Sequence, residues 1–328
     1  MAAESNATMP NDDYDPYDPD LYETSETAAR ILLGLRYAVS ISSGVAVLEN
    51  LLVIFVIIGT RKLRVKHYGF VVNLALGDLL FAALAIVFPW YEHHAIFALF
   101  MSCYVVSVLT ILAVAINRLL AVSLMPPSRY DSLVTGGRLF VACVIIWAVS
   151  LILNLISVMA NDDLVTFWIY GLIRPMTVFV IWLITAILYF VVYRKIARFT
   201  PSSADAKTEP DSGQITVRVS QTRKVLITFI IILLVSFVCW MPYSIVRFIS
   251  FFDPSQFFST KFDVAYWFAG LLYCLSAMIN PVIYWGKLDG FRESFNALFC
   301  CCCSKQSERN YADDNDKTEF EQTVADAV

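Results

Sequence analysis

The sequence has few charged residues: Asp, Glu, Lys and Arg make up 16% of its 328 positions, whereas 58% are hydrophobic. Soluble domains have about 25% charged and about 45–50% apolar residues. A chain with so little charge cannot cover a water-exposed surface with polar groups. The composition therefore excludes an ordinary soluble protein and predicts that most of the apolar surface faces lipid.

The sequence also lacks the short motifs of common enzymes. It has no G-x-S-x-G, no H-E-x-x-H and no phosphate-binding loop. Asp78 lies in an apolar stretch, but Asp131, the partner that an aspartyl protease would need, lies in a polar segment. We find no internal repeat of the transporter kind and no rings of like charge along a pore. These absences argue against an enzyme, a transporter and a channel.

The charge that is present is unevenly distributed. Residues 1–32 carry a net charge of −7, residues 33–303 carry +7, and residues 304–328 carry −4. Both ends are rich in acidic and small polar residues and lack apolar periodicity, which is typical of disorder. The sequence predicts disordered acidic tails at 1–32 and 304–328 around a membrane domain at 33–303.

Seven stretches are long and apolar enough to cross a bilayer, which needs about 20 residues of helix. They are Tyr37–Thr60, Tyr68–Tyr91, Ala95–Ile116, Leu139–Ala160, Pro175–Tyr193, Val225–Val246 and Val264–Trp285. The fifth begins earlier, near Leu164, if Arg174 is tolerated inside it. The predicted fold class is an all-α membrane protein, a bundle of seven transmembrane helices.

Lysine and arginine set the expected orientation, because they concentrate on the cytoplasmic side of membrane proteins. With the N-terminus outside, 19 of the 24 basic residues fall on the cytoplasmic side. We therefore expect an extracellular N-terminus and a cytoplasmic C-terminus. Asn6-Ala7-Thr8 is then a glycosylation acceptor on the outer side.

Four polar residues lie near the middle of predicted spans: Asn50, Asp78, Ser107 and Asn280. Polar groups in hydrocarbon are costly, so they are expected to meet one another. Two arrangements fit: a cation held by the Asp78 carboxylate, or a hydrogen-bonded network with a partly protonated Asp78.

The spans carry an ordered series of motifs. The series is Asn50 in Glu-Asn-Leu-Leu-Val, Asn73-Leu-Ala-Leu-Gly-Asp78, Arg118, Trp147, Cys239-Trp-Met-Pro242 and Asn280-Pro-Val-Ile-Tyr284. With this series the chain resembles a rhodopsin-like (class A) G-protein-coupled receptor over residues 33–303. Within this family, the chain resembles the branch of melanocortin, cannabinoid, lysophospholipid and adenosine receptors. It shares three traits with that branch: Glu49-Asn50, the lack of a Cys at the start of span three, and Ile181 in span five.

The resemblance implies a mechanism. An extracellular or membrane-derived ligand activates a heterotrimeric G protein by outward movement of the sixth helix, with Trp240 and Pro242 as its hinge. Asn280, Pro281 and Tyr284 form the corresponding switch in the seventh helix. Arg118, Tyr189 and Tyr284 line the crevice that meets the G protein, and Asp78, Ser107 and Asn280 resemble the family's allosteric sodium site.

The resemblance also implies a plasma-membrane location and features at the C-terminal end. Residues Lys287–Phe299 are similar to the short amphipathic eighth helix, and Cys300, Cys301, Cys302 and Cys303 to its palmitoylated cysteines. Tail serines and threonines are expected substrates for a receptor kinase and so attract arrestin. Nucleic acid is not an expected partner, and no cofactor is expected apart from the sodium ion.

The chain departs from the family pattern at Asn117-Arg118-Leu119, where most relatives have Asp-Arg-Tyr. Thr222 likewise stands where many have an acid. Two restraints on the resting state are then missing, which predicts raised basal signalling; the alternative is compensation elsewhere. The same departure keeps open a non-signalling decoy or scaffold.

Two arginines in the outer halves of spans give the clearest indication of the ligand. Arg174 and Arg247 both align with the upper pocket, and two cations facing one cavity favour a carboxylate or phosphate on a lipid-like small molecule. Phe100 supplies apolar contact and Trp240 lies beneath. Alternatively, the arginines extend to the interface or pair with Glu92 or Asp253, and the acidic N-terminal tail gathers a basic, melanocortin-like peptide.

Two further positions bear on the pocket. Cys274 stands where opsins carry the retinal lysine, so a Schiff base cannot form there. Only 40 residues separate Asp78 from Arg118, which predicts a tight turn around Pro89–His94. That short connection is either genuine or the mark of an exon missing from the sequence.

Overall fold

The computed structural model describes residues 19–64, 68–91, 93–124, 127–160, 163–199 and 212–299. Within this part, seven helices are long and apolar enough to cross a membrane. They are α1 (Pro19–Gly59), α2 (Tyr68–Val87), α3 (His94–Ser123), α5 (Gly136–Ala160), α7 (Arg174–Phe199), α8 (Ser212–Phe252) and α9 (Thr260–Lys287). The prediction of a seven-helix membrane bundle is confirmed.

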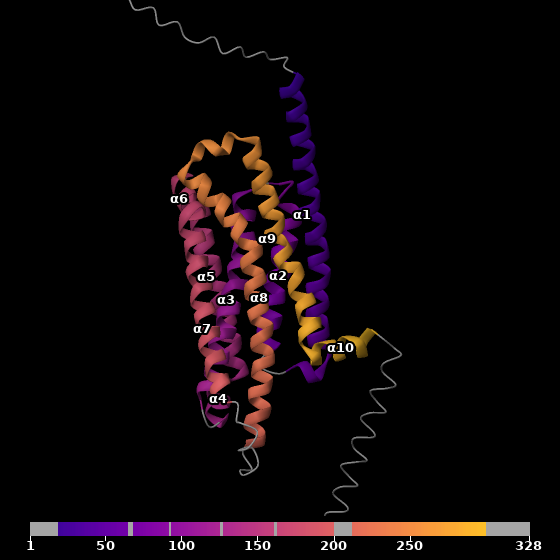
Figure 1. Cartoon of the computed structure of the whole chain (residues 1–328), viewed down its shortest axis with the longest axis vertical. Helices are drawn as coiled ribbons and strands as arrows, with labels where there is room; N and C mark the ends of the chain where they lie inside the picture. The colour runs from indigo at the N-terminus through magenta and orange to yellow at the C-terminus, as the bar shows by residue number, and fades with distance from the viewer. Residues whose placement is uncertain are drawn as a thin grey trace, which may run out of the picture.

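Figure 1 shows the seven helices side by side, with α10 (Asp289–Phe299) running across one end of the bundle. We call this the α10 end. Three shorter elements connect the long helices: η1 (Arg61–Leu63), α4 (Pro127–Leu133) and η3 (Pro254–Phe258). Two more, α6 (Asp163–Trp168) and the π-helical turn η2 (Ile169–Ile173), directly precede α7. The helix α10 matches the expected amphipathic segment after the seventh span.

The first helix begins earlier than the sequence analysis placed it. It starts at Pro19, well inside the segment 1–32 that was predicted to be disordered, so residues 19–32 are helical. Arg30 Nη2 donates to Glu26 Oε1 at 2.7 Å, one turn apart on the same helix face. Such i, i+4 pairs support a helix in water, although each contributes only about 0.2–0.5 kcal/mol.

The fifth span takes the longer of its two predicted forms. It runs from Leu164 to Ala197 through α6, η2 and α7, so that Arg174 lies inside it. The turn between α2 and α3 is as tight as predicted: the amides of Trp90 and Tyr91 both donate to Val87 O at 3.0 Å. Trp90 Nε1 also donates to Ser40 Oγ at 2.8 Å, which fixes the turn against α1.

The outer surface of the bundle is apolar. Large apolar side chains of the long helices are exposed, for example Leu48 at 68%, Phe140 at 70% and Val238 at 68%. Exposed side chains of this kind gain nothing from water and are suited to lipid tails. The distribution is that of a multi-pass membrane protein.

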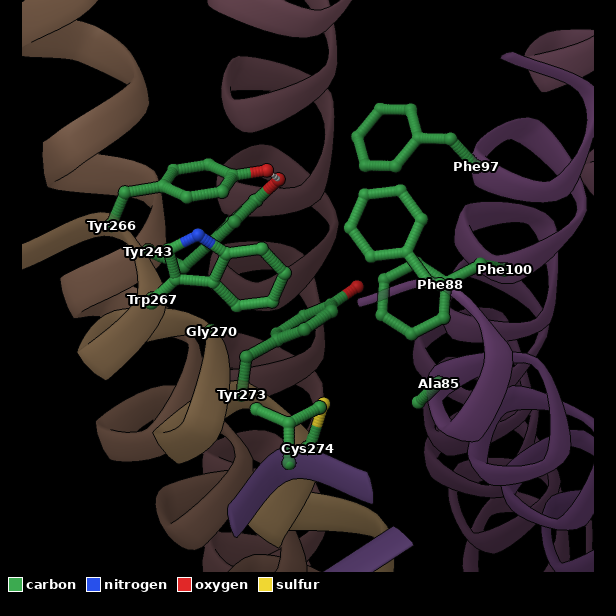
Figure 2. Close-up of a pocket in the computed structure, with 11 residues that line it drawn as sticks. Ala85, Phe88, Phe97, Phe100, Tyr243, Tyr266, Trp267, Gly270, Tyr273 and Cys274 are labelled. Atoms are coloured by element: carbon green, nitrogen blue, oxygen red, sulfur yellow. Dashed lines mark hydrogen bonds between the residues drawn. The ribbon is translucent and has the colours of Figure 1, made fainter. Parts of the chain in front are cut away.

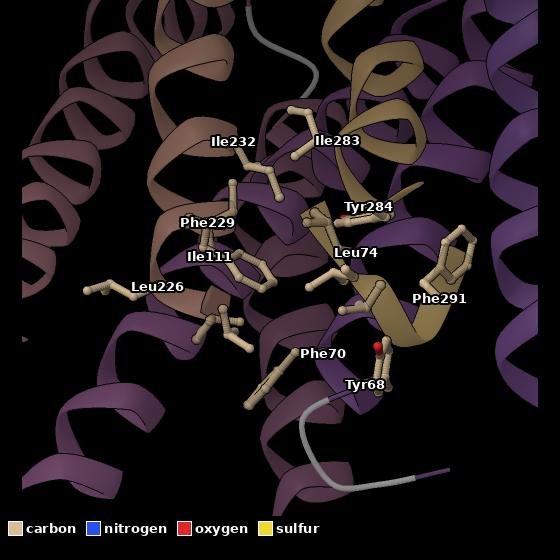
Figure 3. Packing of buried hydrophobic residues seen from close by; sticks show 14 of the residues in the cluster. Tyr68, Phe70, Leu74, Ile111, Leu226, Phe229, Ile232, Ile283, Tyr284 and Phe291 are labelled. Carbon is tan, nitrogen blue, oxygen red and sulfur yellow. The ribbon is translucent and has the colours of Figure 1, made fainter. Parts of the chain in front are cut away.

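The helices are held together at the α10 end by a large apolar cluster (Figure 3). Tyr189, Phe229 and Tyr284 are almost completely buried there, against side chains from α2 and α3. Since interiors are close-packed, separating α8 from its neighbours at this end requires these contacts to break together. The structure is therefore closed at the α10 end.

A proline in the seventh span leaves a backbone carbonyl to which Asn50 of α1 can donate a hydrogen bond. Pro281 has no backbone N–H, so the carbonyl of Ala277, four residues earlier, loses its helical donor. Asn50 Nδ2 donates to that carbonyl at 3.1 Å and to Ala46 O at 2.8 Å. A side chain from α1 thus satisfies a backbone group of α9, as the bilayer interior requires.

A second polar link joins three helices. Asn73 Nδ2 donates to Thr110 Oγ1 at 2.7 Å, and Trp147 Nε1 donates to Asn73 Oδ1 at 3.0 Å. The link connects α2, α3 and α5. Two of the motif residues found in the sequence, Asn73 and Trp147, therefore fix helix positions.

Candidate functional site

An aromatic cleft lies between helices (Figure 2). Phe88 and Phe97, which line it, lie where α2 ends and α3 begins, at the end of the bundle opposite α10. The cleft encloses about 360 Å³ counted to its open mouth. The rings fill most of this space, because only about 30 Å³ is open to the centre of a water-sized sphere, so a small molecule enters only if some rings move. The lining is mostly apolar with a few polar groups, as in small-molecule sites. Its lining residues are Val39, Ala85, Phe88, Phe97, Phe100, Tyr243, Tyr266, Trp267, Gly270, Tyr273 and Cys274.

Two groups of rings face each other across this aromatic cleft. Phe88, Phe97 and Phe100 lie on the side of α2 and α3, and four rings from α8 and α9 lie opposite (Figure 2). Phe88 and Phe100 stack with centroids 5.8 Å apart. On the α8 and α9 side, the hydroxyls of Tyr243 and Tyr266 are 3.5 Å apart.

Tyr273 is the central ring. Its centroid is 4.6 Å from Tyr104, 5.1 Å from Phe81 and 5.2 Å from Tyr243. Its hydroxyl donates to Met101 Sδ at 3.5 Å, and only 1% of the residue is exposed. One side chain of α9 therefore packs against α2, α3 and α8 at once.

Trp240 lies beneath the aromatic cleft and does not line it. It is buried in α8, with its ring stacked on Tyr104 at 6.3 Å between centroids. Tyr104 in turn packs against Tyr273, so Trp240 contacts the cleft through one intervening layer. Pro242 follows within the same helix, which is unbroken from Ser212 to Phe252.

Arg174 brings a cation to this layer from the fifth span. It follows the π-helical turn η2, and π-turns add a residue that reorients the side chains beyond them. The guanidinium lies 5.1 Å from the ring centre of Tyr170 and 5.8 Å from that of Phe97, a residue of the aromatic cleft. Its Nη2 atom is buried and has no hydrogen-bond partner among the described residues.

The electrostatic neighbours of Arg174 are mostly tyrosines. They include Tyr273 and Tyr243, which both line the aromatic cleft, and the second cation Arg247. Arg247 is half-buried and is not a lining residue. The two arginines thus lie near each other, as the sequence suggested, but only Arg174 contacts a ring of the cleft.

Of the two alternative partners expected for these arginines, Glu92 lies outside the described residues, and Asp253 is engaged elsewhere. Its Oδ1 accepts from Ser255 N at 3.2 Å, and its Oδ2 accepts from Gln256 Nε2 at 2.8 Å. The pKa of the Asp253 carboxyl is lowered first by the hydrogen bond from the Ser255 hydroxyl and then by the one from Gln256. Asp253 therefore caps η3.

Of the four mid-membrane polar residues, Asp78, Ser107 and Asn280 meet as the sequence predicted. The amide of Asn50 instead donates to backbone carbonyls of α1 and α9. Ser107 Oγ donates to Asp78 Oδ1 and Asn280 Nδ2 donates to Asp78 Oδ2, both at 2.7 Å. Asp78 is 4% exposed. Asn280 Oδ1 is buried without a partner in the described residues, so the cluster holds an unsatisfied oxygen beside a carboxylate.

The residues expected to meet a G protein are buried at the α10 end. Arg118 is 7% exposed and lies near Tyr189, whose hydroxyl donates to Ile111 O at 3.2 Å. The neighbouring Asn117 accepts a hydrogen bond from Tyr130 of α4 at 3.0 Å. Tyr284 is fully buried. Arg118, Tyr189 and Tyr284 are thus covered in this conformation.

Some predicted sites fall outside the described residues: the glycosylation acceptor Asn6 and the four cysteines Cys300, Cys301, Cys302 and Cys303. Four other cysteines, in α3, α5, α8 and α9, are free thiols. Thr222 lies within α8.

Sequence reasoning missed most of the aromatic cleft. Of its lining residues it singled out Phe100 for ligand contact, whereas Tyr266, Trp267, Gly270, Tyr273 and Cys274 form a continuous α9 wall. Their spacing of three, four and seven residues puts them on one helix face. That spacing was available in the sequence.

Comparison with known proteins adds an independent result. A model of the family described as "7 transmembrane receptor (rhodopsin family)" matches residues 49–284. Similar proteins include the tachykinin-like peptides receptor 86C of Drosophila melanogaster, 26% identical over 296 residues, and cannabinoid receptor 1 of Xenopus laevis, 24% identical over 292 residues. Adenosine receptor A3 of Ovis aries is 26% identical over 302 residues.

These alignments cover 79%, 78% and 83% of the chain. They cover 57% and 61% of the first two relatives and 92% of the adenosine receptor. Two of the three relatives belong to groups that the sequence motifs resemble, and the tachykinin-like receptor lies outside them.

Proposed function

Because the chain belongs to the rhodopsin family of seven-transmembrane receptors, which are signalling receptors rather than enzymes, we propose that the aromatic cleft holds its ligand. The ligand class that fits best is an amphipathic small molecule with an apolar body and one anionic group. The apolar body lies among the facing rings, and the anionic group meets Arg174.

The observation that supports this ligand class is the buried Nη2 atom of Arg174 without a hydrogen-bond partner in the described part of the chain. Leaving a charged donor unsatisfied in a buried place is costly. A carboxylate or phosphate would satisfy it with a charge-assisted, often bidentate, pair of hydrogen bonds. The second cation, Arg247, adds to the attraction for an anion.

The signal passes from the cleft through two ring contacts, that of Tyr273 with Tyr104 and that of Tyr104 with Trp240. A ligand that displaces Tyr273 or Tyr104 shifts Trp240, and Pro242 lets the α8 helix bend at that level. The α10 end of α8 then moves outward, exposing Arg118, Tyr189 and Tyr284 to a heterotrimeric G protein. In this proposal the cleft faces the outside of the plasma membrane and the α10 end faces the cytoplasm.

The proposed anion contact is tested by Arg174→Gln, which keeps hydrogen-bonding capacity and removes the charge. Nucleotide exchange is measured with a panel of G proteins, using a lysophospholipid with a phosphate group and the uncharged monoacylglycerol with the same chain. We expect Arg174→Gln to weaken the response to the lysophospholipid about 10–100-fold, since hydrogen bonds to charged groups contribute about 1.5–3 kcal/mol.

The matched control is Lys261→Gln, which removes an exposed base near the same end of the bundle. It should leave the response unchanged. A receptor that ignores both lipids but responds to a basic peptide would support the peptide-binding alternative. Failure to promote exchange on any G protein would instead support a decoy or scaffold.

We further propose that Asp78, Ser107 and Asn280 hold a sodium ion. The donor set fits, because sodium prefers oxygen ligands and the cluster offers a carboxylate, a hydroxyl and the unsatisfied Asn280 Oδ1. A bound ion would compensate the buried charge of Asp78 and link α2, α3 and α9 in the closed arrangement.

The sodium proposal predicts a cation-specific stability. Sodium chloride at about 0.15 M should raise the melting temperature of the purified protein above its value in choline chloride of equal ionic strength. Asp78→Asn should abolish this difference. Glu49→Gln, which changes another carboxyl in a membrane span, should retain it, and equal loss in both variants would contradict the proposal.

The remaining assignments are proposals from the family and the sequence. They are glycosylation at Asn6, palmitoylation at Cys300–Cys303, and phosphorylation of the C-terminal tail by a receptor kinase followed by arrestin binding. The domain organisation consists of an acidic N-terminal tail, the receptor domain and an acidic C-terminal tail.

A further inference from the structure

A second groove lies at the α10 end, far from the aromatic cleft. It is formed where α1 ends, α2 begins and α5 begins, and it encloses about 1150 Å³ counted to its open side. Its lining residues are Ile57, Ile58, Leu63, Arg64, Tyr68, Gly69, Val72, Gly136, Leu139, Phe140 and Cys143. Tyr68, labelled in Figure 3, belongs both to this lining and to the buried apolar cluster. We call this second groove the basic groove.

The basic groove opens toward lipid. Two of its lining residues, Ile58 and Phe140, are 57% and 70% exposed, and each lies in a helix that spans the membrane. Most of the other lining side chains are apolar. An apolar groove that opens sideways from a membrane bundle is filled by hydrocarbon, so its occupant is expected to have an acyl chain.

The rim of the groove carries a fixed positive charge. Arg64 Nε and Nη2 donate to Ile58 O at 2.9 and 2.6 Å, which holds the guanidinium against the end of α1. Arginine has five N–H donors, so this contact leaves three for another acceptor. Because Arg64 is already positioned, binding an anion there costs little side-chain entropy.

The surrounding sequence is basic as well. Residues 57–72 contain four Lys or Arg residues and no Asp or Glu. The cytoplasmic leaflet carries anionic lipids and attracts such segments. The charge of the rim therefore selects an anionic headgroup, while the apolar lining selects a chain.

We propose that the basic groove binds an anionic phospholipid of the cytoplasmic leaflet. The phosphate contacts Arg64, and one acyl chain follows Val72 and Cys143 between α2 and α5. The lipid then bridges the ends of three helices at the α10 end. The leaflet rests on the orientation given under the proposed function, but the ligand and the groove are separate from the aromatic cleft.

The proposal is tested on the full-length protein in mixed phosphatidylserine and phosphatidylcholine of identical chains. Lipids that remain bound after purification are counted by native mass spectrometry. We expect Arg64→Gln to lower phosphatidylserine retention about fivefold, the effect of about one basic contact at a membrane surface. Lys62→Gln removes the same charge from an exposed position outside the lining and should change retention little.

A second pair of variants tests the chain. A Cβ at Gly69 meets open space, so Gly69→Phe is expected to fill the groove without disturbing the helices, and it should reduce retention of phosphatidylserine. Gly137→Phe is the matched control, because Gly137 is equally open but does not line the groove.

Three outcomes would overturn the proposal. Equal losses in Arg64→Gln and Lys62→Gln would show attraction to the whole surface. Unchanged retention in Gly69→Phe would place the lipid elsewhere. Retention of phosphatidylcholine that is lost in Gly69→Phe but kept in Arg64→Gln would identify a site for lipids without net charge. A failed response to ligands at Arg174 affects none of these measurements.

Discussion

Replacing Tyr273 by alanine is expected to lower the free energy of unfolding by about 3–5 kcal/mol, the range for deleting a large buried aromatic side chain. Tyr273 is 1% exposed and its ring packs against rings from α2, α3 and α8. The surrounding aromatic side chains are rigid and cannot collapse into the space. Thermal unfolding of the detergent-solubilised protein measures the loss.

Two controls separate the ring from its hydroxyl and from its helix. Tyr273→Phe removes only the contact with Met101 Sδ and should cost much less than the alanine variant. Phe268→Ala deletes a ring of the same helix that is 53% exposed, and it should be nearly neutral. A loss in Phe268→Ala as large as in Tyr273→Ala would show that α9 tolerates no truncation and would remove the special role of Tyr273.

Restoring a carboxylate beside Arg118 is expected to reduce basal signalling. In Asn117→Asp the new carboxylate keeps the hydrogen bond from Tyr130 and places a negative charge next to the buried Arg118. A charge-assisted contact contributes about 1.5 kcal/mol or more, so ligand-independent nucleotide exchange should fall about tenfold. The measurement is exchange on purified G protein in nanodiscs without ligand.

The matched control is Ser132→Asp, which adds the same charge at an exposed position near Tyr130. It should leave exchange unchanged, since exposed charges interact weakly. Unchanged basal exchange in Asn117→Asp would sink the idea that the missing acid raises basal activity. It would show that the buried packing at Tyr189 and Tyr284 restrains the resting state by itself.

The sequence was sufficient to predict the seven spans and the polar contacts inside them. Hydropathy is read over windows of about 20 residues, so single errors average out. Intramembrane polar residues are rare and costly, so Asp78, Ser107 and Asn280 had few possible partners other than each other. The same reasoning placed Asn50 near α9, although the carbonyl that it satisfies became evident only with Pro281.

The aromatic cleft was harder to predict for the opposite reason. The chain has 24 Phe, 16 Tyr and 7 Trp residues, and a ring facing lipid looks the same in sequence as a ring facing a cleft. Phe268, which is exposed, is adjacent to Trp267, which lines the cleft. The spacing along α9 shows which rings share a face, but only the rotation of the helix in the bundle shows which face lines the cleft.

The direction in which the Arg174 side chain points was also hard to predict, because it depends on the π-helical turn η2. A π-turn changes the phase of the helix after it, and the residues of η2 carry no sequence signal that separates this turn from an ordinary α-helix. The early start of α1 has a similar origin, since helix formation at 19–32 rests on marginal local contacts such as Glu26 with Arg30.

The shortness of the connections at the cleft end has a kinetic consequence. Helix α2 ends at Val87 and α3 begins at His94, while α5 ends at Ala160 and α6 begins at Asp163. Neither connection is long enough to fold over the aromatic cleft as a lid, so ligand exchange does not wait for a lid between these helices to open. Under the proposed function, the residence time of a ligand in the aromatic cleft is therefore expected to depend on its contacts with the rings and Arg174 and on separation of the helix ends.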